Sequence, residues 1–369
     1  MKKLAIIGAS YLQMPLVKKA KAMGIETHCF AWVDGAVCKD VADYFYPISI
    51  LEKEAIFEIC KTVGIDGITT IATDMAVPTI AYVAEKLNLV ANSYESSLYA
   101  TNKFLMRKAF KMNHCKVPGF YEVADENAPN TLNYPVIVKP VDRSGSRGVS
   151  KVASQNELKN NIKTAIEESF SKRAIIEEYI EGVEVSVETI SWNGEHFILS
   201  ITDKTTTGAP HFVEIAHHQP SLLPKNIQKI IEKETLKSLN ALNVNYGAGH
   251  SEFKITPSGE AYVIEVGARM GGDFIGSHLV ELSTGYDFLK GVIEVALNEF
   301  TIPVLANKKY AGVYFLSEET KKILPIFNSD SDFEIEKNIF NTQLKTIKSS
   351  NDRSGYFIYQ SESKRIQLL

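Results

Sequence analysis

Short apolar runs alternate with amphipathic stretches over the first 95 residues of the chain. The apolar runs lie at 4–7, 26–31 and 67–72, and stretches with helical periodicity follow them up to residue 21 and at 54–63 and 75–87. This alternation is typical of βαβ units on a parallel sheet. The first turn, at 8–13, lacks the GxGxxG spacing that brings backbone against a pyrophosphate. A scaffold or substrate-contacting role is therefore favoured there over a dinucleotide site.

The pattern changes after residue 100. A helix is predicted within 100–123, and the Asp-, Asn- and Pro-rich stretch at 124–134 is typical of a domain junction. Further strands are predicted at 135–140, 174–180, 184–192 and 196–203, and further helices at 155–170, 224–242 and 275–300. From about residue 305, short strands such as 310–316 and 356–359 are separated by charged turns. This tail predicts a small α+β or β-rich subdomain.

Composition excludes several classes of partner. The 369 residues are 45% hydrophobic and 23% charged, as expected for a globular protein of two or three domains. A net charge of −4 gives no reason to expect nucleic-acid or anionic-membrane binding. The four cysteines show no CxxC spacing, and no apolar run approaches the roughly 20 residues of a membrane span. We expect a cytoplasmic protein with reduced thiols and a small-molecule partner.

Two glutamates on neighbouring apolar runs give the first chemical signal. Glu252 lies in His-Ser-Glu-Phe-Lys and Glu265 in Val-Ile-Glu-Val-Gly, and the Pro-Ser-Gly-Glu stretch at 257–260 is typical of a hairpin turn. Both carboxylates could then project from one face of two paired strands, where burial is costly without a cation. Oxygen ligands without nearby cysteine favour Mg²⁺ or Mn²⁺, which usually serve phosphate chemistry. The alternative is a coincidental spacing of two solvent-facing residues.

Two upstream segments have the composition of nucleotide contacts. Lys139 ends an apolar strand, and the following loop, Asp-Arg-Ser-Gly-Ser-Arg-Gly at 142–148, could surround phosphate oxygens with N–H groups and positive charge. It is not a Walker A loop, and a β-hairpin with a basic tip is the alternative. The strand at 174–180 ends in a turn whose backbone could pair with an adenine edge, with Glu184 near the ribose. A surface strand with acidic residues has the same pattern.

Taken in order, Lys103, Lys139 with its loop, the hinge at 177–184, Glu252 and Glu265 resemble the ATP-grasp superfamily, in which two α+β subdomains close on ATP. The resemblance covers about residues 15–300. It implies α/β and α+β architecture, with three parts. These are an N-terminal Rossmann-like parallel sheet at 1–100, an ATP-grasp domain of two α+β subdomains at 101–304 with a lid at about 124–182, and a small β-rich C-terminal subdomain at 305–369.

The resemblance also implies a set of ATP-site residues. Phosphates would contact Lys103, Lys139, Lys204 and the lid residues Ser144, Gly145, Ser146, Arg147 and Gly148. Adenine and ribose would contact Glu177, Glu178, Tyr179, Ile180, Glu184 and Ile264. Glu252 and Glu265 would bind Mg²⁺ or Mn²⁺. The alternatives of a solvated Lys204 and a plain core Ile264 stay open.

One position departs from the superfamily pattern. Many ATP-grasp enzymes place an asparagine two residues after the second glutamate as a third metal ligand, and this chain has Gly267 there. Waters or phosphate oxygens could complete the coordination shell, since Mg²⁺ commonly keeps several waters. The departure leaves the number of metal ions open.

Two more segments resemble the carbamoyl-phosphate-synthase-like branch and, more narrowly, its L-amino-acid (dipeptide) ligases. They are Gly-Ala-Arg-Met-Gly-Gly after Glu265 and Phe-Val-Glu-Ile-Ala-His at 212–217. The resemblance implies that Glu214 holds an ammonium group, that His217 lies near the reacting carboxylate, and that Arg269 pairs with a carboxylate or an acyl phosphate. The implied substrate-binding set is Glu214, His217, Arg269, Gly271 and Gly272.

The histidines differ in what they imply. His250 occupies a position where some relatives have a catalytic arginine, so the implied catalytic set is Arg269, Lys139 and His250. For His211 and His218 a structural role is favoured. Arginine is suited to paired contacts with an oxyanion, which agrees with the role implied for Arg269.

The expected activity is therefore that of an ADP-forming ligase. A substrate carboxylate would attack the γ-phosphate of Mg-ATP, and an amine would then displace phosphate from the acyl phosphate to form an amide. The expected partners are a small carboxylate and a small amine, which are amino acids by the resemblance, and a homodimer is common among such ligases. Nucleic acid and membrane are not expected partners.

Other readings remain. Gly8, Gln13 and Pro15, with Thr101-Asn102-Lys103, also resemble purine-pathway ligases of the phosphoribosylglycinamide synthetase type, although residues 1–95 offer no second phosphate cradle. A non-catalytic ATP-binding protein is the second alternative, and the retained glutamates, Lys139 and Arg269 argue against it. A Rossmann-type oxidoreductase is disfavoured by the missing GxGxxG.

Overall fold

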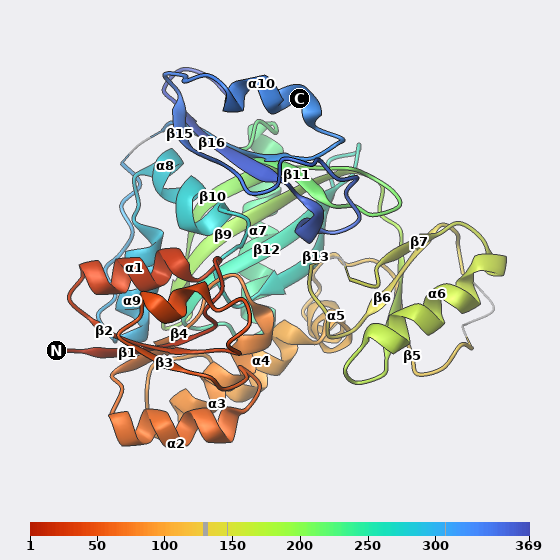
Figure 1. Ribbon diagram of the computed structural model, residues 1–369. Coiled ribbons are helices and arrows are strands. Elements are labelled where there is room, and N and C mark those ends of the chain that lie inside the picture. Colours follow the sequence, from red (N-terminus) through yellow and green to blue (C-terminus); the bar gives the residue numbers. More distant parts are fainter. Residues whose placement is uncertain (128–131, 146, 307) are drawn as a thin grey trace.

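The structure is a computed structural model that describes residues 1–127, 132–145, 147–306 and 308–369 (Figure 1). Its strands form three sheets, of which the first is a parallel sheet of four strands in the order β3-β2-β1-β4. The elements of this N-terminal part are β1 (Lys3–Ile7), α1 (Met14–Ala22), β2 (Glu26–Phe30), η1 (Val37–Asp40), β3 (Tyr44–Tyr46), α2 (Lys53–Val63), β4 (Gly67–Thr69), η2 (Asp74–Ala76) and α3 (Val77–Leu87). The predicted βαβ arrangement is confirmed.

The helix that the sequence predicted within 100–123 is present as α5 (Lys103–Met112), and a second helix, α4 (Tyr94–Thr101), precedes it. Asn102 ends α4, and its side-chain oxygen accepts hydrogen bonds from the backbone N–H groups of Phe104 and Leu105, which caps α5. An asparagine in extended backbone thus stops one helix and starts the next. Lys103 consequently lies in the first turn of α5.

The second sheet is antiparallel and belongs to the part of the chain that projects from the body at the right of Figure 1. Its order is β5-β8-β6-β7, with helix α6 packed on it. The elements are β5 (Phe120–Val123), β6 (Val136–Pro140), β7 (Ser150–Val152), α6 (Gln155–Glu168) and β8 (Ala174–Glu178). Val138, Ile176, Leu158 and Ile162 form its own apolar core. This projecting unit, called the lid below, is made of residues 120–178.

The third sheet has eight strands in the order β13-β12-β9-β10-β11-β14-β16-β15. Its elements are β9 (Val183–Trp192), β10 (Glu195–Thr206), β11 (Glu214–Gln219), α7 (Lys225–Ala241), β12 (Gly247–Ile255), β13 (Ala261–Gly267), η3 (Ile275–Leu279), α8 (Val280–Thr284), α9 (Phe288–Ala296), β14 (Tyr310–Leu316), η4 (Lys321–Ile323), α10 (Leu324–Phe327), β15 (Glu334–Ile339), η5 (Ser350–Asp352) and β16 (Gly355–Ser361). The β-rich C-terminal segment is present, and its strands continue the central sheet instead of forming a sheet of their own.

The seam between β11 and the C-terminal strands depends on one glycine. His218 on β11 is paired with Gly312 on β14, and because Gly312 has no side chain, the His218 ring reaches across it to the hydroxyl of Tyr359 on β16, with Nδ1 and the oxygen 3.0 Å apart. A Cβ at position 312 would overlap both rings. His218 is buried here, as the structural role favoured for it requires.

Within the described residues, no helix is both long and apolar enough to cross a bilayer.

We expect His218 to make the protein sensitive to mild acid. Burial, assisted by the nearby Arg365, lowers the pKa of His218 to about 3 from the ordinary 6.5. In the unfolded chain His218 therefore binds a proton below about pH 6.5, whereas in the folded chain it does so only below about pH 3. The free energy of unfolding consequently falls as pH falls through this window. Between pH 6.5 and 5 the loss is about 2 kcal/mol. His218→Leu should flatten the dependence of the melting temperature on pH over this range, and a profile as steep as that of the wild type would contradict the prediction.

Candidate functional site

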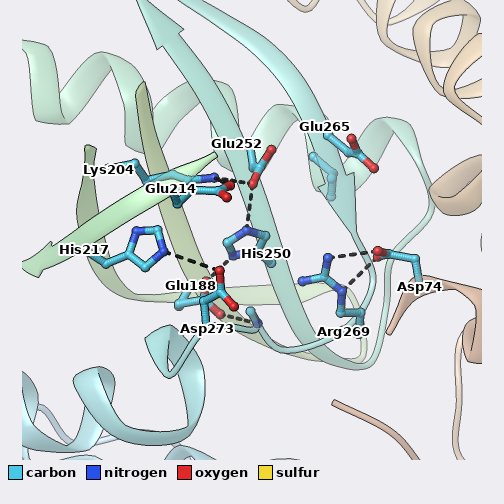
Figure 2. A network of polar contacts seen from close by, with 12 residues as sticks. Asp74, Glu188, Lys204, Glu214, His217, His250, Glu252, Glu265, Arg269 and Asp273 are labelled. Atoms are coloured by element: carbon cyan, nitrogen blue, oxygen red, sulfur yellow. Dashed lines mark hydrogen bonds and ion pairs between the residues drawn. The ribbon is translucent and has the colours of Figure 1, made fainter. Parts of the chain in front are cut away.

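The strand pair β12 and β13 brings the two glutamates together. Glu252 and Glu265 are direct partners in the antiparallel register, and both line a cavity of about 230 Å³ between the lid and the central sheet. Side chains on directly opposed residues of such a pair have Cβ atoms roughly 5 Å apart. The side chain of Glu252 is 31% exposed and that of Glu265 is 24% exposed, so both carboxylates are accessible from the cavity. The shared face predicted from the sequence is thus present (Figure 2).

A cation accompanies each of the two carboxylates. Lys103 Nζ lies 2.9 Å from Glu265 Oε1, and Lys204 Nζ lies 2.6 Å from Glu252 Oε1. Burial opposes ionisation of Glu252, but Lys204 and His250 outweigh it and hold the pKa of Glu252 well below its usual range. Two lysines from distant segments of the chain therefore approach the two acids.

Lys204 is itself buried, with 4% of its side chain exposed. Burial disfavours its charge, yet Glu252 and Glu214, the latter 3.3 Å away, raise the pKa of Lys204 above its ordinary value. The alternative of a solvated lysine is therefore excluded by the geometry. Lys204 links the pair of glutamates to the Glu214 side of the site.

His250 connects Glu252 to a second buried acid. Its Nδ1 contacts Glu188, whose side chain is fully buried, and its Nε2 lies 3.2 Å from Glu252 Oε1. Burial lowers the pKa of His250, but Glu188 and Glu252 outweigh burial and raise it to about 9, so the ring carries a positive charge at neutral pH. The other oxygen of Glu188 accepts the N–H of Gly271 at 2.9 Å. One chain of contacts thus runs from the Gly271 loop to Glu252.

A second charge cluster joins α5, the lid and β13. Glu177 on β8 lies 2.6 Å from Arg107 Nε and 2.7 Å from Lys139 Nζ, and all three side chains are buried. Arg107 also donates to the carbonyl of Ile264 at 2.5 Å. Burial, with the nearby Arg107 and Lys103, lowers the pKa of Lys139 in spite of Glu177. Both oxygens of Glu177 already pair with these two cations, so a direct contact between this side chain and adenine is not favoured.

The remaining nucleotide-site candidates surround the same cavity. Its lining includes Lys103, Lys139, Ser144, Gly145, Glu177, Glu178, Tyr179, Ile180, Glu184, Lys204, Ile264 and Arg269. Arg147 lies instead in a neighbouring cavity, Gly148 lines neither, and Ser146 falls outside the described residues. Ile264 faces the cavity together with Ile137 and Val185, which favours the apolar floor over a plain core position.

The lid loop is tied to the body by its backbone. Lys103 Nζ donates to the Arg143 carbonyl at 2.7 Å, and Arg143 Nε donates to the Glu168 carbonyl at 2.5 Å while its guanidinium lies 3.6 Å from the centroid of the Phe170 ring. Lys103 therefore contacts both the lid and Glu265. Its position makes it a direct link between the lid loop and the carboxylate pair.

A neighbouring cavity of about 740 Å³ holds the residues that the resemblance assigned to substrate. It is lined by Lys204, Glu214, His217, His250, Glu252, Arg269, Gly272 and Asp273 and by the N-terminal turn at 8–13. Gly271 borders a smaller recess beside Gly272. The cavity shares Lys204, Glu214, His250, Glu252 and Arg269 with the cavity of the lid, so the two are continuous.

Arg269 is held by an aspartate that sequence analysis did not identify. Asp74, at the start of η2 just after β4, accepts from Arg269 Nε at 2.8 Å and from Nη2 at 2.9 Å (Figure 2). Burial opposes the charge on Asp74, but Arg269 holds the pKa of Asp74 below its usual range. Ligand sites in parallel sheets lie beyond the carboxyl ends of strands, and this rule could have pointed to Asp74.

The same aspartate accounts for the missing asparagine at position 267. A Cβ on Gly267 would lie 2.6 Å from Asp74 Oδ1, closer than Cβ atoms approach in folded proteins, and 3.2 Å from the Arg269 guanidinium carbon, which is a tight contact. The ion pair therefore occupies the space that a larger residue would need. Gly267 and Asp74 are coupled features of this site.

Two further residues near His217 were missed because no local pattern marks them. Asp273 Oδ2 lies 3.9 Å from His217 Nε2 and accepts from Arg353 Nη1 at 2.8 Å, and Arg353 also donates to the Glu214 carbonyl at 2.8 Å. Neither ring nitrogen of His217 has a hydrogen-bond partner among the described residues. Burial lowers the pKa of His217 despite Asp273, so its imidazole is neutral. His211, by contrast, is exposed, and no cavity described above includes it.

A search of known protein families matches residues 132–277 to an ATP-grasp domain. Among curated proteins, alanine–anticapsin ligase of Bacillus subtilis is 26% identical over 302 residues, which cover 71% of this chain and 64% of that protein. The carbamoyl phosphate synthase large chain of Clostridium acetobutylicum is 28% identical over 231 residues, which cover 56% of this chain and 21% of that protein. The chain thus spans less than two thirds of these relatives.

Among solved structures, the L-amino acid ligase of Bacillus licheniformis superposes with a TM-score of 0.83. The match covers 98% of this chain and 94% of that one at 24% sequence identity. At this level of identity the likeness establishes the fold. The fold expected from the resemblance is confirmed.

We expect Arg107 to be required for the stability of the lid junction. Arg107→Met would leave part of the buried charge of Glu177 uncompensated, which typically costs about 3–5 kcal/mol. Arg173→Met is the matched control. Arg173 lies 3.0 Å from Glu122 but its side chain is half-exposed, so this ion pair should contribute under about 1 kcal/mol to stability. Melting temperatures of the two variants measure the difference, and equal losses would refute the role of Arg107.

Proposed function

We propose, from the ATP-grasp domain that this chain carries at residues 132–277, that the protein is an ATP-dependent, ADP-forming carboxylate–amine ligase. The observation that carries the proposal is the opposed pair Glu252 and Glu265, which faces Lys139 and Lys103 in one cavity. That cavity opens directly onto a second one lined by Arg269, Glu214 and His217. A nucleotide side and a substrate side thus meet at the same charged groups.

The cavity of the lid suits ATP in its charge and its walls. Ile137, Val185 and Ile264 offer apolar surface to a base, and the backbone at 178–180 offers hydrogen-bonding groups beside it. Lys139 has three N–H donors, and one of them points to Glu177, 2.7 Å away. The other two can donate to phosphate oxygens. The lid residues Ser144 and Gly145 lie at the same cavity. These features support the assignment of ATP to this side of the site.

The donor set of Glu252 and Glu265 fits Mg²⁺ or Mn²⁺. Two opposed carboxylates are hard oxygen ligands, and both keep exposure to the cavity. No cluster of three or more acidic, histidine or cysteine side chains suited to a metal is found among the described residues, and Mg²⁺ typically takes its other ligands from water and phosphate. When bound there, the ion would neutralise phosphate charge and help stabilise the transition state.

The residues of this chain support a two-step reaction. In the first step a carboxylate oxygen of the acid substrate attacks the γ-phosphorus and the bond to ADP breaks, while Lys139 and Arg269 stabilise the negative charge that develops. Arg269 has five N–H donors, of which Asp74 takes two and the Met270 carbonyl one, so two remain for an oxyanion. In the second step the amine nitrogen bonds to the acyl carbon, phosphate leaves, and the nitrogen loses a proton.

The substrate side suits amino acids. The Glu214 carboxylate can accept from an ammonium group, and the neutral His217 has a free ring nitrogen for a hydrogen bond near the reacting carboxylate. Support for this substrate class comes from alanine–anticapsin ligase, whose name describes the joining of alanine to anticapsin, and from the similar L-arginine-specific L-amino acid ligase of Bacillus subtilis. Lid closure would exclude water, which would otherwise hydrolyse the acyl phosphate.

A substrate panel tests the proposal. Wild-type protein with Mg-ATP should release ADP and phosphate in the presence of amino-acid pairs, and mass spectrometry should find the corresponding amide. Phosphoribosylamine with glycine forms the contrasting arm. Turnover with that pair alone would replace the proposal by a purine-pathway ligase, and nucleotide binding without turnover on either arm would indicate a non-catalytic ATP-binding protein.

Glu265→Gln tests the carboxylate pair. The amide keeps the shape of the side chain but removes its charge, so ADP formation should fall by about 100-fold or more as transition-state charge loses its compensation. Glu260→Gln is the control, because Glu260 lies on the turn of the same hairpin, half-exposed and paired with Lys116. Circular dichroism should report the same fold for both variants. Wild-type turnover by Glu265→Gln would contradict the assignment.

A further inference from the structure

A third cavity, of about 640 Å³, lies beside the substrate cavity and is used by none of the steps above. It is bounded by the N-terminal end of α1, the Phe274 segment, the edge strand β15 and its neighbour β16. It shares Tyr11, Asp273, Ser350 and Asn351 with the 740 Å³ cavity that contains Arg269 and His217. A molecule that fills the substrate cavity can therefore extend into this one.

Five Phe and Tyr rings line the third cavity, together with polar and charged side chains that include Lys18 and Glu336. Phe274 packs against Tyr356 with ring centroids 4.4 Å apart and faces Phe315 at 6.3 Å, while Tyr11 and Phe340 add exposed rings. Exposed aromatic rings that surround a hollow leave apolar surface in contact with water, and an apolar ligand group would remove it. The chemistry of these walls therefore favours a large apolar group.

The cavity is polar where it joins the substrate cavity. Arg353 lies with its guanidinium carbon 3.8 Å from the centroid of the Phe315 ring and donates to Asp273, which stands where the two cavities join. Burial opposes the charge on Asp273, but Arg353 holds the pKa of Asp273 below its usual range. A ligand that enters the aromatic walls thus meets a fixed carboxylate on the side that faces the reaction centre.

The turn that carries Asp273 and Phe274 is strained. Both residues have positive φ angles, +51° and +67°, which is uncommon for residues with a Cβ and an outlier for a bulky side chain. Such strain persists only where the surrounding structure requires it, and it clusters at ligand sites. Here it puts a carboxylate at the junction and the next ring in the aromatic wall.

We propose that the aromatic cavity binds the large apolar side chain of one amino-acid substrate, with the polar end of that substrate toward Asp273. This inference rests on the proposed function and specifies its substrate class. Phenylalanine or tryptophan would place a ring among Tyr11, Phe274 and Phe340, whereas alanine would leave those rings in contact with water. The cavity is therefore a specificity pocket for bulky apolar amino acids.

A matched pair of substitutions tests the pocket. Val37 lines it and is half-exposed, so Val37→Trp should narrow the pocket without disturbing a core. Val33 is equally exposed in the same loop region but lines no cavity described above, so Val33→Trp is the control. We expect the wild type and Val33→Trp to favour phenylalanine over alanine by about tenfold or more in kcat/KM for ADP formation. Val37→Trp should lose most of that preference.

Two outcomes would overturn the inference. A wild-type preference for small side chains, or a preference that Val37→Trp leaves unchanged, rejects the pocket while amide formation still supports the ligase. If no amino acid supports ADP formation, calorimetric titration with phenylalanine and alanine in the presence of a non-hydrolysable ATP analogue still tests the pocket. Tighter phenylalanine binding that is weakened by Val37→Trp alone supports it, and equal binding by the three proteins rejects it.

Discussion

The site depends on charge compensation between segments that are far apart in the sequence. Glu265 needs Lys103 from α5, Glu252 needs Lys204 from β10, and Glu177 needs both Arg107 and Lys139. Carboxylates placed this close would repel one another and resist burial without these cations. The same lysines are the donors that would meet phosphate groups. Under the proposed function, nucleotide binding would exchange partners within an existing network, and Lys103, which donates to the Arg143 carbonyl, would connect the lid to that exchange.

Most of the residues predicted for the nucleotide side line one cavity, and the signals that pointed to them are local in the sequence. A lysine that ends an apolar strand, a glycine-rich loop and two glutamates across a hairpin each lie within a few residues, and the strand register follows from the turn between them. The residues of the substrate cavity were harder to predict from the sequence. Asp74, Glu188, Asp273 and Arg353 come from four separate segments, and only the tertiary fold brings them together.

Gly267 shows how one departure from a family pattern is explained by a distant residue. A glycine where a ligand is usual would suggest a weakened metal site if position 267 were considered alone. The structure instead fills that space with the Asp74–Arg269 ion pair, so the N-terminal sheet reaches into the centre of the reaction site. Arg269 is oriented by this contact, and its direction toward an oxyanion depends on how the N-terminal part packs against β13. The glycine and the aspartate form one structural unit.

The two halves of the site are built under different constraints. The nucleotide cavity is enclosed by the lid and by adjacent strands of the central sheet, where a change in one side chain would disturb buried ion pairs. The aromatic cavity is enclosed by the first helix, the Asp273–Phe274 turn and the last two strands of the sheet, β16 and β15, and Tyr11 and Phe340 on its rim are exposed. Substitutions at such a rim cost little stability. Under the proposed function, substrate preference could therefore change at the rim while the nucleotide side, which depends on the buried charges, stays the same.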